Sequence, residues 1–205
     1  MFIVIEGIEG SGKSTLAGGL AERLRSEGHD VVVTREPGGT PVGDAVREIF
    51  LNRAISISPV TESMLVNAAR AQHVADIVRP ALAAGRVVLC DRFTDSTLAY
   101  QGYGRGLDLD SLRAVCDIAT GALQADLTLV LDAPLSVTHA RLRERSATRD
   151  RIETEGEGFH ERVRRGFLKL AQSPAHRLLD ATQPSGQLVE QALHEVRGWM
   201  EARVP

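Results

Sequence analysis

Residues 7–14 read Gly-Ile-Glu-Gly-Ser-Gly-Lys-Ser, and this stretch constrains the fold more than any other in the chain. The apolar run of residues 2–5 ends just before it, and leucine then recurs at every fourth position from Leu16 to Leu24. Such a change of period is expected where a buried strand gives way to a helix. The glycines let backbone amides turn inward, and the start of the following helix favours an anion. The pattern predicts a strand, a phosphate-binding loop and a helix, in that order.

The loop predicts the class of enzyme, an ATP-dependent kinase. We expect Lys13 to neutralise phosphate charge and the Ser14 hydroxyl to ligate magnesium. The predicted ATP-binding residues are Gly7, Ile8, Glu9, Gly10, Ser11, Gly12, Lys13 and Ser14. A glycine-rich turn with a solvated lysine is the alternative, and it requires both the composition and the strand-to-helix context to mislead.

The alternation of strand and helix patterns continues along the chain and predicts the fold class. Further apolar, strand-like runs are Val31 to Thr34, Val87 to Asp91, Leu127 to Asp132 and Leu178 to Asp180. Stretches long enough for helices separate them, including one from near Val60 to before Gly85 with Ala71, Val74, Ala75, Val78 and Leu82 on one face. We therefore expect a three-layer α/β fold with a five-stranded parallel sheet between helices.

Size and composition narrow the organisation and the partners. A chain of 205 residues fits one domain, residues 1–205. Its net charge of −3 comes from 24 basic and 27 acidic residues that are well mixed, which argues against polymeric nucleic acid as a partner. No apolar run approaches the roughly 18 residues that cross a bilayer. Two cysteines, Cys90 and Cys116, and no secretory leader indicate the cytoplasm.

Polar side chains at the carboxyl ends of the predicted strands mark the expected cleft. Asp91 and Arg92 end the third strand, where both can face phosphates, although a surface ion pair would look the same. Arg35 opens the stretch Arg-Glu-Pro-Gly-Gly-Thr after the second strand. On turn chemistry alone that stretch is as consistent with a plain connector as with a binding turn.

Arginines concentrate between residues 141 and 151, where we predict a lid at about residues 143–153. A guanidinium can follow charge as it spreads over a transferring phosphoryl group, and closure of a lid excludes water. The alternative is a solvated basic helix face.

Six ordered segments together resemble the thymidylate kinase family of bacteria. They are residues 5–15, Thr34-Arg-Glu-Pro-Gly-Gly-Thr40, Asp91-Arg92-Phe93, Ala99-Tyr-Gln-Gly102, Asp150-Arg-Ile-Glu153 and Leu179-Asp-Ala-Thr182. The resemblance implies transfer of the ATP γ-phosphoryl group to dTMP, a requirement for Mg²⁺, and a homodimer. It also implies that Ser14 and Asp91 place the metal and that Glu9 approaches the acceptor.

The resemblance assigns the acceptor site as well. Arg35 and Arg92 match residues at the acceptor phosphate, Arg70 matches one at the base, Thr97 and Gln101 match pocket residues, and Tyr100 matches an aromatic residue that crowds the second carbon of the sugar. Crowding there would favour deoxyribose over ribose. Val66 departs from the family, in which we expect a phenylalanine stacked on thymine.

The expected catalytic residues are Lys13, Arg92, Arg145, Arg149 and Arg151, and the lid arginine that meets the γ-phosphate stays open among the last three. Val66 makes a kinase for another nucleoside monophosphate the main alternative. A P-loop nucleotide switch is a second alternative, although the chain has no Asn-Lys-x-Asp segment for reading guanine. A homologue that binds without catalysis is a third.

Overall fold

The computed structural model describes residues 1–145 and 149–202, and within them five parallel strands form one sheet. The strand order is β2-β3-β1-β4-β5. The strands are β1 (Phe2–Glu6), β2 (Val31–Arg35), β3 (Val87–Asp91), β4 (Leu127–Asp132) and β5 (His176–Asp180). This confirms the predicted α/β fold. The last strand begins at His176 rather than at Leu178, because its first residues are polar and gave no apolar signal.

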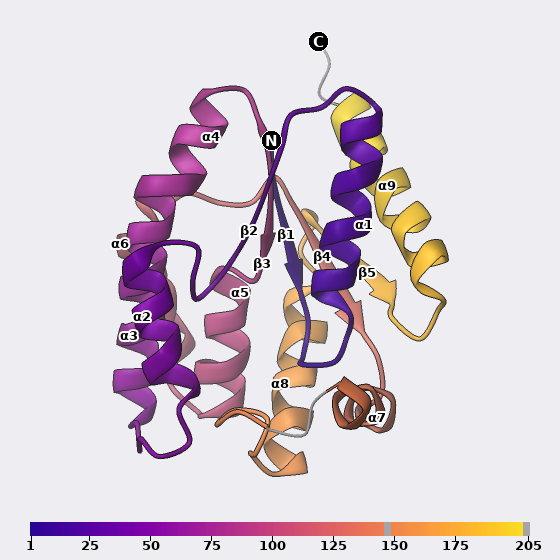
Figure 1. Cartoon of the computed structure of the whole chain (residues 1–205). Coiled ribbons are helices and arrows are strands. Elements are labelled where there is room, and N and C mark those ends of the chain that lie inside the picture. Colours follow the sequence, from indigo (N-terminus) through magenta and orange to yellow (C-terminus); the bar gives the residue numbers. More distant parts are fainter. Residues whose placement is uncertain (146–148, 203–205) are drawn as a thin grey trace.

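Helices connect the strands and cover the sheet (Figure 1). They are α1 (Lys13–Ser26), α2 (Pro41–Leu51), α3 (Pro59–His73), α4 (Arg79–Ala83), α5 (Thr94–Thr97), α6 (Leu109–Thr120), α7 (Leu135–Arg145), α8 (Glu157–Leu170) and α9 (Ser185–Glu201). Two π-helical segments, η1 (Val74–Val78) and η2 (Leu98–Gly104), continue α3 and α5. None of the helices in these described parts of the chain is long and apolar enough to cross a membrane.

Alternate residues of β1 divide the core between the two faces of the sheet. Ile3 and Ile5 join one apolar cluster with the leucines of α1 and the apolar face of α9. Phe2 and Val4 join another with Val74 and other residues of η1 and α4. Figure 1 shows α1 and α9 together on one side of the sheet, and α2, α3, α4 and α6 on the other. The sheet is therefore covered on both faces, as a parallel sheet requires.

The helical region between residues 59 and 83 is where the predicted pattern needs correction. Its existence is confirmed, but Ala71 and Ala75 are exposed, while Val74 and Val78 are buried. The π-helical segment η1 interrupts the 3.6-residue period at this point, so residues before and after it face the core in a different phase. The single amphipathic face predicted for residues 71–82 is therefore wrong, because it assumed one α-helical period through η1.

The carboxyl ends of the strands meet at one edge of the sheet, and α7 and α8 lie at this end of the molecule, at the bottom of Figure 1. In the parallel register Asp91 is paired with Ile5 of β1 and with Arg35 of β2. The Glu36 amide also donates to the Asp91 carbonyl, 2.9 Å away. The first loop, the turn after β2 and the end of β3 are thus fixed beside one another.

Candidate active site

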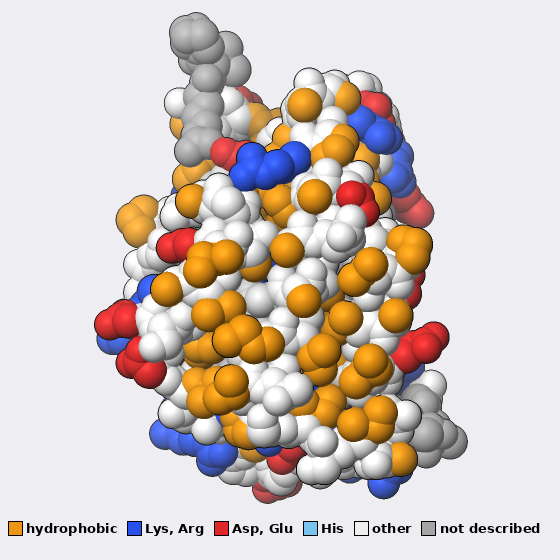
Figure 2. All heavy atoms as spheres, turned by 90° about the vertical axis from the view of Figure 1, so that its left-hand side faces the viewer, with side chains coloured by type: hydrophobic (Ala, Val, Ile, Leu, Met, Phe, Trp, Pro, Cys, Tyr) orange, Lys and Arg blue, Asp and Glu red, His pale blue; other side chains and the backbone are white. Residues whose placement is uncertain are grey.

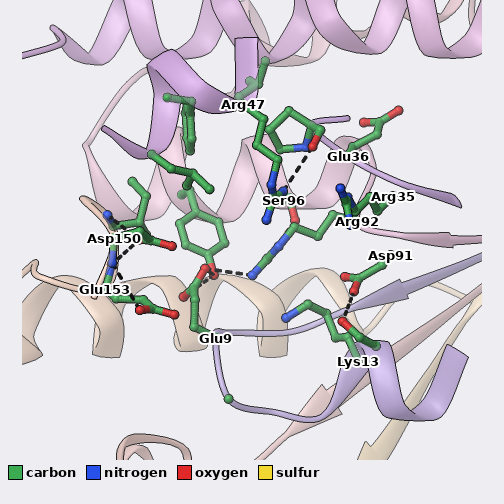
Figure 3. Close-up of a pocket in the computed structure, with 18 of the residues that line it drawn as sticks. Glu9, Lys13, Arg35, Glu36, Arg47, Asp91, Arg92, Ser96, Asp150 and Glu153 are labelled. Atoms are coloured by element: carbon green, nitrogen blue, oxygen red, sulfur yellow. Dashed lines mark hydrogen bonds and ion pairs between the residues drawn. The ribbon is translucent and has the colours of Figure 1, made fainter. Parts of the chain in front are cut away.

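A cavity of about 440 Å³ opens at this edge of the sheet. Its walls come from the loop after β1, the turn after β2, the helices α2 and α3, the end of β3, the α5–η2 segment and α7. Figure 3 shows Lys13 and Asp91 at one end, Asp150 and Glu153 at the other, and Glu9 and Arg92 between them. A single space therefore extends from the phosphate-binding loop to the segment that carries Asp150 and Glu153.

The phosphate-binding loop has the predicted backbone conformation. Gly7 and Gly10 have φ of 139° and 76°, in the region that favours glycine. A Cβ on Gly7 would lie 2.5 Å from the Leu131 carbonyl oxygen, so close approach of the chains also requires glycine there. Lys13 is buried, and its ammonium donates to the carbonyls of Gly7 and Ile8 at 3.0 and 2.9 Å. Burial and the nearby Arg92 charge lower the pKa of Lys13 to about 8.

Ser14 and Asp91 form an oxygen pair beside this lysine. The Ser14 hydroxyl donates to the Asp91 carboxylate at 2.8 Å, and both residues line the cavity. Hydroxyl and carboxylate oxygens are the ligands that Mg²⁺ prefers. The two predicted metal ligands, from segments 77 positions apart in the sequence, are therefore adjacent and chemically suited to the ion.

The guanidinium groups that line the cavity include those of Arg35 from β2, Arg47 from α2 and Arg92 just after β3. Burial, together with the charges of Arg35 and Arg92, lowers the pKa of Arg47. A bound anion would offset this repulsion between like charges. Arg92 is also held with φ of 78°, a left-handed conformation that a non-glycine residue adopts at an energetic cost and that is typical of functional sites.

Glu9 organises the space between the loop and these arginines. Its carboxylate accepts from Arg92 at 2.8 Å, and the Tyr100 hydroxyl lies 2.7 Å from each of its oxygens. Burial alone would raise the pKa of Glu9, but the charges of Arg92 and Lys13 hold it below its ordinary value. The Arg92 guanidinium also lies over the Tyr100 ring, 5.0 Å from its centroid. An ionised carboxylate, a phenol and a guanidinium thus form one rigid group.

The model of the family described as thymidylate kinase matches residues 5–192. A thymidylate kinase of Desulfovibrio desulfuricans is 48% identical over 212 residues, which cover 99% of this chain and 98% of that protein. One from Pseudomonas fluorescens is 53% identical over 196 residues (94% and 92% covered), and one from Geobacter sulfurreducens is 53% identical over 182 residues (86% and 85%).

The chain belongs to the thymidylate kinase family. It is therefore a nucleoside monophosphate kinase that uses a nucleotide as phosphoryl donor. This outcome agrees with the resemblance drawn from the sequence motifs and disfavours the nucleotide switch.

The residues that the family resemblance placed in the acceptor pocket line the same cavity. They are Val66, Arg70, Thr97, Tyr100 and Gln101. Arg70 is buried and held on several sides, since it donates to Glu36 at 2.7 Å, to Thr97 at 2.9 Å and to the Phe93 carbonyl at 2.8 Å. These bonds fix the Arg70 guanidinium in the wall of the cavity.

The predicted lid covers about residues 143–153, and residues 146–148 of it lie outside the described residues. The structure describes the lid residues on either side of them. Arg145 ends α7, lines the main cavity and pairs with Glu153 at 2.8 Å. Arg149 lines a smaller neighbouring cavity beside Glu9. Arg151 instead pairs with the buried carboxylate of Glu62 at 2.7 Å and donates to the Phe50 carbonyl at 2.8 Å. The three arginines among which the sequence leaves the γ-phosphate contact open therefore have different surroundings.

Sequence reasoning missed several residues that build this site. The Glu36 carboxylate is buried and pairs with Arg70 Nε at 2.7 Å and with His73 Nδ1 at 2.8 Å. Glu62 is buried as well and accepts from Gln101, Arg105 and Arg151. Glu36 could have been found, because it stands inside the recognised Arg-Glu-Pro-Gly-Gly-Thr stretch.

Glu62, Arg47 and Phe50 carried no such signal. Arg47 and Phe50 line the cavity from α2, and Glu62 lies behind it on α3. All occur on ordinary helices, with no motif around them. Only the fold brings them to the site.

Proposed function

We propose that this protein transfers the γ-phosphoryl group of ATP to dTMP with Mg²⁺, giving dTDP and ADP. The observation that carries the proposal is the single cavity, whose lining combines Lys13 and Ser14 of the phosphate-binding loop with Arg70, Thr97 and Gln101. Arg35, Arg47 and Arg92 line the same cavity and supply positive charge for the acceptor phosphate. The relatives named thymidylate kinase support dTMP as the acceptor.

In this proposal the donor phosphates bind the loop formed by residues 7–14. Lys13 exchanges its bonds to the Gly7 and Ile8 carbonyls for phosphate oxygens, and the amides at the start of α1 face the same charge. Ser14 and Asp91 would hold Mg²⁺. When bound, that ion neutralises charge on the donor phosphates.

The acceptor binds with its phosphate at Arg35 and Arg92 and its base between Val66 and Arg70. Thr97 and Gln101 complete the base pocket, and Tyr100, fixed by Glu9, crowds the sugar. Catalysis consists of alignment and charge stabilisation, since phosphoryl transfer has a loose transition state and needs no side-chain nucleophile. Lys13, Arg92 and the lid arginines supply the positive charge.

Among the lid arginines, Arg145 and Arg149 are the better candidates for the γ-phosphate. Arg145 already lines the main cavity, and Arg149 lies by the smaller cavity next to the loop. Arg151 would have to leave Glu62 and Phe50 to reach a phosphate.

A direct assay tests the function. ADP formation is measured with ATP and Mg²⁺ while dTMP, dUMP, dCMP, dGMP and dAMP are offered separately at equal concentration. We expect turnover with dTMP to exceed turnover with each of the others. Faster ADP formation with another acceptor would identify that nucleotide as the substrate in place of dTMP. ATP binding without turnover of any acceptor would contradict the assignment as an enzyme.

We further propose that two copies form a homodimer through the face made by α2, α3 and α6. Figure 2 shows this side of the molecule with apolar side chains spread across it. The exposed apolar residues on these helices are Val42, Ile49, Val60, Met64 and Ile118. Burial of such side chains by a second copy would be favourable.

A cytoplasmic location is also proposed, supported by two buried free cysteines, Cys90 and Cys116.

A further inference from the structure

The cavity wall at residue 66 has a small aliphatic side chain where the family resemblance led us to expect an aromatic ring. Phe50 lines the same cavity from α2, and it shares an apolar cluster with Val66. We propose that Phe50 supplies the aromatic contact to the base of the acceptor. This inference rests on the proposed function and names a residue that determines how its acceptor is bound.

Position and exposure support the assignment. Phe50 lies in the last turn of α2, which packs against α3, the helix that carries Val66 and Arg70. The two apolar side chains are almost equally enclosed, with 7% and 8% of their surface exposed. A ring at residue 50 can therefore occupy the apolar wall of the base pocket without any change of backbone.

The other ring that lines the cavity in the described part of the chain already has partners. Tyr100 hydrogen-bonds to Glu9 through its hydroxyl, and its ring lies beneath the guanidinium of Arg92. Both partners belong to the phosphate and sugar end. Phe50 is thus the aromatic side chain available to the base.

Arg151 holds Phe50 in place. Its guanidinium lies 5.0 Å from the centre of the Phe50 ring, and its Nε donates to the Phe50 carbonyl at 2.8 Å. The Arg151 amide donates to the Leu51 carbonyl at 3.1 Å, and Glu62 fixes the far end of the guanidinium. A ring fixed by a cation on one side loses little freedom when a base contacts it.

The test replaces Phe50→Leu and measures the dissociation constant of the acceptor by calorimetry. The titration uses the nucleoside monophosphate that the wild-type enzyme turns over best, so that a different acceptor does not prevent the experiment. We expect the dissociation constant and KM for the acceptor to rise roughly fivefold, as loss of an aromatic pair implies. KM for ATP should stay within about twofold.

Two further variants separate contact with the base from general packing. Phe167→Leu removes a ring from the same apolar cluster but outside the cavity lining. It should lower the melting temperature with less than about a twofold change in acceptor affinity. Val66→Phe combined with Phe50→Leu returns a ring to the pocket and should recover most of the lost affinity.

The outcomes are distinguishable. Acceptor affinity unchanged by Phe50→Leu would overturn the inference while leaving the kinase assignment intact. An equal loss for ATP and acceptor, or the same loss in Phe167→Leu, would also overturn it, because both indicate a structural effect. Failure of the wild-type enzyme to phosphorylate any nucleoside monophosphate would instead overturn the proposed function.

Discussion

Lys13 carries the charge that the proposed function assigns to the donor phosphates. Its ammonium is buried and satisfied by two carbonyl oxygens of its own loop, at 3.0 and 2.9 Å. A buried ammonium is stabilised only while such partners are present. In the proposed function donor phosphates replace these carbonyls as partners of the ammonium, so the charge stays satisfied when the donor binds.

The first prediction concerns this charge. Lys13→Met keeps a similar length but removes the ammonium, and we expect the turnover rate to fall at least a hundredfold because the charge acts mainly in the transition state. Steady-state kinetics measure the effect, and circular dichroism serves as the control for an intact fold. Near-normal turnover would contradict the assigned role.

Glu6 gives a second prediction, about stability and pH. It is fully buried and accepts from the Phe93 amide at 2.8 Å. Burial first, and then the charge of Asp95, raise its pKa from 4.5 to about 7. Between these values the folded state keeps a proton that the unfolded state has released, so the free energy of unfolding should fall as pH rises through this window, by about 3 kcal/mol.

Denaturant unfolding from pH 4 to pH 8 tests this, with Glu6→Gln as the variant. The amide does not titrate, so the stability of Glu6→Gln relative to the wild type should increase with pH. Glu22→Gln, at an exposed position of α1, is the matched control and should run parallel to the wild type. Parallel curves for Glu6→Gln would show that the carboxyl group of Glu6 titrates normally.

At the scale of elements, α7 carries one lid arginine that lines the cavity and another that does not. Arg145 lines the cavity, whereas Arg143 is exposed and outside its lining. In the proposed function Arg145 is a candidate to meet the transferring phosphoryl group, so we expect Arg145→Ala to lower kcat at least tenfold with little change in KM for dTMP. Arg143→Ala should behave like the wild type. Equal effects of both variants would assign the loss to the helix instead.

The elements themselves were largely predictable from the sequence. Buried parallel strands appear as short apolar runs, and the glycine and lysine positions of the loop have a fixed spacing, so β1, α1 and the loop between them were placed correctly. The edge strand β5 was placed less well, since Leu178 is half exposed and the first two residues, His176 and Arg177, are polar.

The supporting residues of the site were not predictable in the same way. Glu62 meets Arg151 across 89 positions and Gln101 across 39, and such pairings leave no periodic trace in a sequence. Similarly, the apolar residues Val74 and Val78 of the π-helical segment η1 are spaced as in an ordinary α-helix, so the apolar pattern did not reveal this segment. Convergence in space, and not local pattern, determines these contacts.

At the scale of the whole molecule, the prediction is the assembly. Light scattering should give twice the chain mass of 22.2 kDa. Met64→Glu, on the face of α2, α3 and α6, should shift the mass toward one chain, because a charge would be buried in the interface. Leu178→Glu is the control, at a similarly exposed position on β5 at the opposite edge of the sheet. A monomeric wild-type protein, or equal dissociation of both variants, would contradict this interface.

The fixed surroundings of Arg70 also have a thermodynamic consequence. With Glu36, Asn67, Thr97 and the Phe93 carbonyl as partners, its guanidinium is immobile before the acceptor arrives. At the other end Lys13 must change partners, and the exposed Arg145 must be ordered. Ordering exposed side chains costs conformational entropy, whereas a preassembled pocket has already lost it on folding. The acceptor should therefore bind with the smaller entropic penalty, and the donor should show the larger one.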